Sequence, residues 1–179
     1  GASYPWYTYH ASIGNTSEVR LNSTNAATVN NTWNNTSPTS TVFTLGAPSG
    51  GSNASGDAYV AYCWAEVAGF SKFGSYTGNG SADGPFVYCG FRPRWIIVKR
   101  TDSTGNWAMI DTSRGPYNSD TAALFSNLSN AEGNYTYGFD VLSNGFKLRE
   151  PTNSDINNSG GTYIYAAFAE NPFQIARAR

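Results

Sequence analysis

Short runs of aromatic and β-branched residues alternate along the chain with stretches rich in Gly, Asn, Ser and Thr. One such run lies within residues 55–66, SGDAYVAYCWAE, and follows a Gly-rich stretch. This composition predicts a strand that enters a sheet. The residues that would point to either side of the strand are apolar, so we expect a central strand buried on both faces.

The same pattern returns near the C-terminus, where residues 159–170 read SGGTYIYAAFAE and align with residues 55–66 without a gap. Further matches follow in the same order at nearly constant offset: Trp6 with Trp107, Gly14 with Gly115, Leu21 with Leu124, Phe43 with Phe146, and Leu45 with Leu148. This order indicates an internal duplication. We interpret residues 1–179 as one domain with repeat halves at about 1–69 and 102–179, joined by residues 70–101.

The second half carries a leading apolar strand, FRPRWIIVKR at residues 91–100, that has no counterpart in the first half. Two explanations follow from this asymmetry. Either the chain is the C-terminal part of a longer polypeptide, which is the explanation we expect, or a neighbouring subunit covers the missing strand position.

The remaining pattern predicts an all-β protein. A hairpin is expected from residues 135–142 to 146–149, because Asn144-Gly145 is a strong turn signal. Residues 121–128 are ambiguous between a strand and a short helix, and the Gly-rich residues 74–85 predict a long loop. Further strands are expected at 6–9, 19–24, 41–45, 91–100 and 107–111. Many short strands with Asn and Gly turns favour an antiparallel two-sheet β-sandwich of the jelly-roll, concanavalin A-like type.

Charge and hydropathy exclude several classes of function but do not identify one. The formal net charge is −1, too small to attract nucleic acid or anionic lipid. We also expect no membrane insertion, because no apolar run approaches the roughly 18–20 residues of a membrane helix. The two cysteines, Cys63 and Cys89, are either free buried thiols or a single disulfide.

Residues for catalysis or metal binding are scarce. His10 is the only histidine, so neither a zinc site nor a serine triad is expected. We predict no cofactor, with a loop calcium ion at Asp83 or Asp102 as a minor alternative to turn-forming roles. No carboxylate pair of the glycosidase type stands out, because Glu66 and Glu170 are isolated, repeat-related positions at strand ends.

A basic cluster brackets one predicted strand and is expected to be charged strand ends that reach solvent. Its members are Arg92, Arg94, Lys99 and Arg100.

A binding surface is the remaining hypothesis. Trp33, Tyr76 and Tyr117 lie in polar or Gly-rich surroundings, as exposed aromatics of carbohydrate sites do. The polar partners would be Asn79 and Asp83 for Tyr76, and Arg114 and Asn118 for Tyr117. The alternative for each ring is that it folds back onto the sandwich.

Four segments together resemble a domain recurrent in the tail fibres and tail-associated proteins of tailed bacteriophages. They are DAYVAYCWAEVAGFSKFGSYTGNGSADGPFVYCGFRP, WIIVKRTDSTGNWAMIDTSRGPYN, VLSNGFKLR and GGTYIYAAFAENPF. The resemblance covers the chain from about Phe43 onward. Position 89 is commonly threonine in that family and position 65 is often histidine, so Cys89 and Ala65 depart from it. The first departure argues against a required disulfide.

The resemblance implies a concanavalin A-like jelly-roll located on the virion, with a non-enzymatic, lectin-like role in host recognition. It brings no catalytic residues. The implied partners are host-surface carbohydrate and other virion subunits, in a homo-oligomer that is expected to be a trimer. The alternatives are a structural decoration or fibre-assembly module and, less favoured, a glycan depolymerase.

Overall fold

The computed structural model describes residues 4–47 and 51–172, and this part of the chain contains no α-helix. The all-β prediction is therefore confirmed. One short 3-10 helix, η1, spans Ala11–Ile13. The strands are β1 (Tyr7–Thr8), β2 (Ser17–Arg20), β3 (Thr28–Val29), β4 (Ser71–Thr77), β5 (Phe86–Tyr88), β6 (Pro93–Arg100), β7 (Trp107–Asp111), β8 (Asp120–Phe125), β9 (Gly133–Leu142), β10 (Gly145–Leu148) and β11 (Thr162–Ala169).

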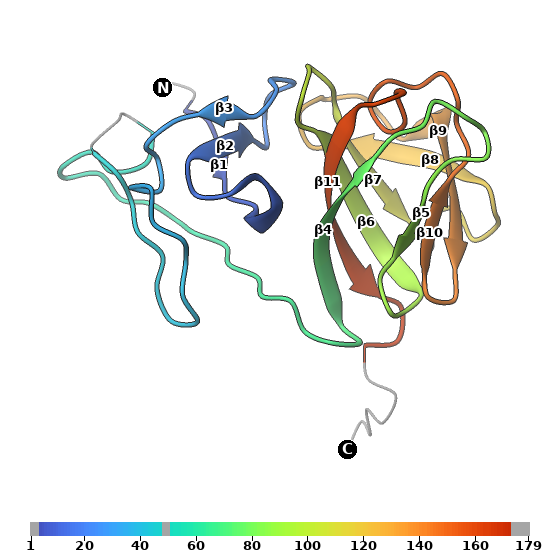
Figure 1. The fold of residues 1–179 in the computed structure, drawn as a ribbon, viewed down its shortest axis with the longest axis horizontal. Helices are drawn as coiled ribbons and strands as arrows, with labels where there is room; N and C mark the ends of the chain where they lie inside the picture. The colour runs from blue at the N-terminus through green and yellow to red at the C-terminus, as the bar shows by residue number, and fades with distance from the viewer. Residues whose placement is uncertain (1–3, 48–50, 173–179) are drawn as a thin grey trace.

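The strands form two antiparallel sheets (Figure 1). A small sheet has the order β1-β2-β3, and a large sheet has the order β4-β11-β6-β7-β8-β9-β10-β5. We call residues 4–47, which contain the small sheet, the N-terminal lobe. Residues 71–172, which contain the large sheet, are the sandwich. This arrangement is consistent with a β-sandwich, and the jelly-roll assignment stays a prediction.

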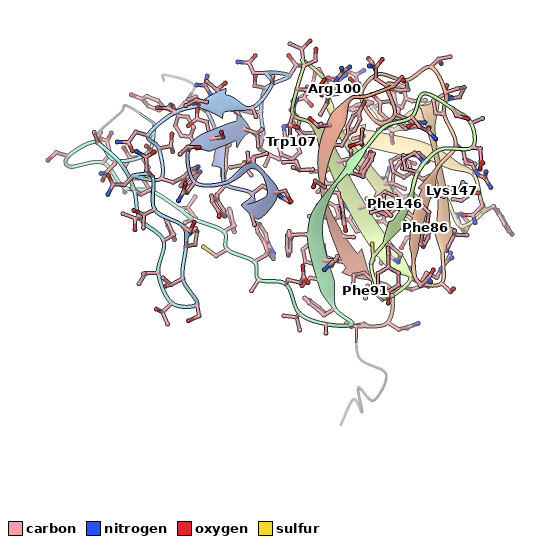
Figure 2. All side chains as sticks on the ribbon, viewed as in Figure 1. Phe86, Phe91, Arg100, Trp107, Phe146 and Lys147 are labelled. Carbon is pink, nitrogen blue, oxygen red and sulfur yellow. The ribbon has the colours of Figure 1, made fainter. Side chains whose placement is uncertain are left out.

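The large sheet folds over on itself, so that strands far apart in its order face one another. The ring of Phe146 on β10 packs edge-on against Tyr165 on β11, with centroids 5.4 Å apart, although these two strands share no ladder. Figure 2 shows Phe146 between the two layers. Fully buried Phe139, Ile156 and Tyr163 complete this core. Burying such large rings is the main favourable contribution to folding.

The N-terminal lobe covers the outer face of the sandwich at β6, β7 and β11. Val19 of the lobe packs with Ile97, Trp107 and Ile164 in a second apolar cluster. Trp107 lies on the side of the sandwich that faces the lobe (Figure 2), and its Nε1 donates to the Arg20 carbonyl at 2.9 Å. The alternating residues of β6 thus contribute to two cores, one on each face.

The prediction of a central strand at residues 55–66 is wrong. Residues 58–66, which we call the exposed segment, form an extended stretch outside any sheet and are exposed throughout. Figure 1 shows this trace running from the lobe to β4 without an arrow. The residues that align with it near the C-terminus form β11, between β4 and β6. A strand needs hydrogen-bonding neighbours. The neighbour that β11 uses on one side is β6, and both edges of β6 are already paired, with β11 and with β7.

Residues 41–45, predicted as a strand, are also outside any sheet. The predicted loop at 74–85 is wrong at its start, since β4 continues through Gly74 to Thr77. The hairpin prediction is confirmed: β9 and β10 pair directly, with Gly145 opposite Leu142. Residues 121–128 resolve to the strand β8 rather than a helix. Both cysteines are free thiols; Cys89 is buried as expected, whereas Cys63 is exposed.

Candidate functional site

Two of the three predicted surface aromatics fold back into the protein. Trp33 is only 8% exposed; its Nε1 donates to the Ser17 carbonyl at 3.0 Å and its ring meets Tyr9 edge-on. Tyr76 stacks on Tyr163 with centroids 5.0 Å apart, and its hydroxyl donates to the Ile156 carbonyl at 2.8 Å. Burial raises the pKa of Tyr76 well above its usual value. Neither ring is placed to stack on a ligand.

The predicted partners of Tyr76 stabilise their own loop. The Asn79 side-chain amide donates to the Asp83 carbonyl at 2.9 Å. The Asp83 carboxylate accepts from the Lys147 ammonium at 2.5 Å and lies 3.8 Å from the Arg149 guanidinium. The hydrogen bond from Lys147 lowers the pKa of Asp83. These contacts hold the loop to itself and to β10, while the Asp83 side chain stays 82% exposed.

Tyr117 is the predicted aromatic that does reach solvent, at 83% exposure. Its predicted partners are engaged elsewhere. Asn118 makes two hydrogen bonds to the backbone of Val141, and Arg114 pairs with Glu132 at 3.2 Å. Tyr117 and Tyr76 therefore do not share one open groove with Trp33, which lies inside the N-terminal lobe.

The isolated carboxylates have structural partners. Glu66 pairs with Lys72 at 2.7 Å, and Glu170 pairs with Arg92 at 2.9 Å and with Arg94 at 3.5 Å. Such contacts fit the structural role predicted for both glutamates.

The two predicted calcium ligands lie in separate, ion-paired loops. Asp102 receives two hydrogen bonds from Arg100, which lower its pKa to about 2. The Asp102 carboxylate also accepts a hydrogen bond from the backbone N–H of Thr162 at 3.0 Å. No group of three His, Cys, Asp or Glu residues in the described ranges is placed to hold a metal ion.

Lys99 departs from the expectation of a solvent-exposed strand end. It is fully buried between the lobe and the sandwich, where its ammonium donates to the carbonyls of Thr24 at 3.1 Å and Gly105 at 2.9 Å. Burial lowers the pKa of Lys99 to about 8. The buried lysine therefore connects the two parts of the molecule rather than facing solvent.

A row of exposed aromatic rings is the most distinctive surface feature of the described chain. Trp6, Tyr62 and Trp64 are 49%, 64% and 64% exposed. The rings of Trp6 and Tyr62 lie 6.3 Å apart with a 16° angle between their planes, and those of Tyr62 and Trp64 lie 6.1 Å apart with a 24° angle. We call these three residues the aromatic ladder. Large exposed apolar side chains in contact with each other commonly mark a binding site.

A hollow of about 220 Å³ adjoins one end of the aromatic ladder, lined by Trp6, Leu21, Asn22 and Ser126. Asn22 is an exposed amide whose Oδ1 accepts from the Trp6 backbone N–H at 3.0 Å and whose Nδ2 donates to the Tyr4 carbonyl at 3.3 Å. One lone pair and one N–H of this amide remain for a ligand. The Ser126 hydroxyl donates to the Leu21 carbonyl at 2.7 Å, which leaves its oxygen free to accept. The hollow thus combines one aromatic wall with amide and hydroxyl groups. It is smaller than the roughly 300–1,000 Å³ of drug-sized ligand pockets.

Sequence reasoning placed Tyr62 and Trp64 in a core strand and Trp6 in another, so it missed the aromatic ladder. The available signal was a difference between the two aligned segments, 55–66 and 159–170. Tyr62 corresponds to Ala166, which is half-buried against the second apolar cluster. A tyrosine at that position would be too large for the equivalent packing.

The fold and the aromatic ladder define an all-β domain with an exposed aromatic surface. The chain belongs to the family described as domain of unknown function (DUF7483), whose family model matches residues 1–172. No curated protein and no solved structure gave a match in the comparisons with this chain. Across the described residues, no helix is long and apolar enough to cross a membrane.

Proposed function

We propose that this chain is a non-enzymatic carbohydrate-binding module of a virion appendage, which attaches to glycans of the host surface. The aromatic ladder is the observation that carries the binding function. The virion setting rests on the resemblance of the sequence to bacteriophage tail-fibre domains.

Carbohydrate recognition matches the chemistry of the aromatic ladder. The C–H faces of sugar rings are apolar and pack on aromatic faces, while their hydroxyls need hydrogen-bonding groups beside the ring. Three nearly parallel rings offer successive stacking positions along a glycan chain. The hollow beside Trp6 supplies the Asn22 amide and the Ser126 hydroxyl at one end. Its size suits a single sugar unit better than a larger ligand.

Glycan-array binding of the purified chain, followed by titration against host polysaccharide, tests the proposal. We expect Trp6→Ala and Trp64→Ala each to weaken binding about tenfold, which corresponds to about 1.4 kcal/mol for a lost stacking contact. Because Trp64 lies outside every sheet and is 64% exposed, its replacement should leave the fold intact. Circular dichroism would check that.

Tyr117→Ala is the matched control, since it also removes a highly exposed ring but lies outside the aromatic ladder. We expect it to bind as the unaltered chain does. Loss of binding in Tyr117→Ala together with full binding in Trp64→Ala would contradict the assignment of the site. Absence of binding to any host polysaccharide at high protein concentration would contradict the proposed function itself.

A further inference from the structure

Most of the backbone of the exposed segment has no hydrogen-bond partner within the described part of the chain. Among the described residues, positions 58–64 make no backbone hydrogen bond. The segment regains contacts only at its end, where the Ser71 hydroxyl donates to the Ala65 carbonyl at 2.8 Å. The side chains are strongly strand-forming, with Val60 63% exposed beside the aromatic ladder. An extended segment with apolar side chains and unpaired backbone N–H and C=O groups is a template for pairing with another strand.

The residues that align with the exposed segment in the second half of the chain form a paired strand. The aligned residues of β11 pair with β4 on one edge and with β6 on the other. The slot of β11 does not suit the exposed segment of another copy. Tyr62 would have to replace Ala166, which is packed against the second apolar cluster, and Ala61 would replace the core residue Tyr165.

We infer that the exposed segments of two copies of this chain pair with each other as antiparallel strands across a two-fold axis. Each copy then supplies the strand neighbour that the other lacks, and the contact closes without leaving a further open edge. Every strand pair in the described chain is antiparallel, as this pairing would be. The inference goes beyond carbohydrate binding and predicts a dimer in place of the trimer expected from the resemblance.

The charges of the segment are compatible with self-pairing. Residues 58–65 carry no charged side chain. With Tyr62 at the two-fold axis, Glu66 lies opposite Ala58, and Asp57 lies opposite Val67. Like charges directly opposite each other on paired strands are destabilising, and this register places none in that position. Glu66 is also paired with Lys72 of its own chain.

Pairing through the backbone leaves the side chains on the faces of the new ribbon. The two aromatic ladders would lie side by side, with the two Tyr62 rings as direct cross-strand neighbours on one face of the ribbon. The ring of Trp64, opposite Val60 of the other copy, would remain available. Dimerisation and carbohydrate binding therefore use different atoms of the same segment, the backbone for one and the ring faces for the other. Variants can separate them.

Analytical ultracentrifugation of the full chain over a dilution series tests the dimer. We expect a monomer–dimer equilibrium in the unaltered chain and a monomer in Val60→Pro or Ala61→Pro. Proline has no backbone N–H and therefore removes one hydrogen-bond donor from a strand pair. Adjacent residues of a strand direct their N–H groups to opposite edges, so at least one of the two variants must break the pairing. Val60→Thr and Ala61→Ser keep the N–H groups and are expected to stay dimeric.

Cys63 provides an independent readout of register. With Tyr62 on the axis, the two Cys63 residues are diagonal neighbours about 7–8 Å apart, within reach of a short bis-maleimide. We expect a cross-linked dimer that Cys63→Ser abolishes, because Cys89 is buried. A monomer at all concentrations, a trimer, or a dimer that survives both proline variants would overturn the inference. Trp6→Ala should bind glycan about tenfold more weakly yet stay dimeric, so failure of one proposal is distinguishable from failure of the other.

Discussion

His10 shows how one side chain connects the lobe to the sandwich. Its Nδ1 accepts from the Ser12 N–H at 3.2 Å, so Nε2 carries the proton and donates to the Tyr165 carbonyl of β11 at 3.1 Å. The ring is buried and also meets Phe73 of β4. Burial lowers the pKa of His10, although the hydrogen bond to Tyr165 acts in the opposite direction.

We predict that acid weakens this contact. Unfolded chains bind a proton at the ordinary histidine pKa of about 6.5, and the folded protein binds it only at lower pH. The stabilisation from neutral His10 is therefore complete above about pH 6.5 and is lost as the pH falls through the window below it. Because His10 is the only histidine, NMR titration of a single imidazole resonance measures its pKa directly. A pKa at or above 6.5 would contradict the prediction.

At the scale of elements, Gly145 allows β5 to lie against β10. A Cβ atom on Gly145 would come within 2.1 Å of the Val87 carbonyl oxygen, a backbone atom. Gly145 pairs with Tyr88 in that ladder. The turn signal that predicts the hairpin and the contact that admits the edge strand β5 thus depend on the same residue.

Gly145→Ala is expected to lower the free energy of unfolding by about 1–3 kcal/mol, because β5 must move to make room. Gly133→Ala is the matched control, since the atoms nearest its Cβ belong to the Tyr135 side chain and lie at 3.3 Å or more. Urea unfolding of both variants measures the difference. Equal stability of the two variants would show that β5 adjusts freely.

Local signals predict the elements whose neighbours are close in sequence. The pair β6 and β7 and the hairpin of β9 and β10 follow from apolar runs on either side of turn residues. The sequence does not predict β4, because Gly74 suggests a loop. In the structure Gly74 is a strand residue that leaves room for the Tyr165 ring, which would lie within 3.0 Å of a Cβ atom at this position. The exposed segment has the composition of a strand but no neighbour within the described chain. Composition alone does not reveal that, and the aromatic ladder on this segment was missed with it.

On the scale of the whole molecule, Lys99 is placed where lobe and sandwich meet. Its ammonium contacts Thr24 of the lobe and Gly105 of the β6–β7 connection. A buried ammonium is unfavourable, which is the main cause of its pKa of about 8. The interface therefore contains a group that titrates well below the ordinary lysine range.

We predict that Lys99 makes stability rise with pH just above pH 8. In that range the folded protein releases the proton while the unfolded chain, with an ordinary pKa of about 10.4, retains it. The slope approaches about 1.4 kcal/mol per pH unit. Cysteine and tyrosine ionisation act in the opposite direction, so the measurement compares the unaltered chain with Lys99→Met. Parallel stability profiles for the two proteins would contradict the role given to Lys99.

The pairing of β4 with β11 determines how the sandwich would respond to tension. Ser71, where the chain enters the sandwich, lies opposite Phe168, near the end of the last strand. A pull on these two points would separate the strands from one end and break their hydrogen bonds one after another. Strands loaded along their length would instead share the force over the whole ladder. The sandwich should therefore open at low force when it is pulled at these two points, and Figure 1 shows the start of β4 and the end of β11 together at its lower end.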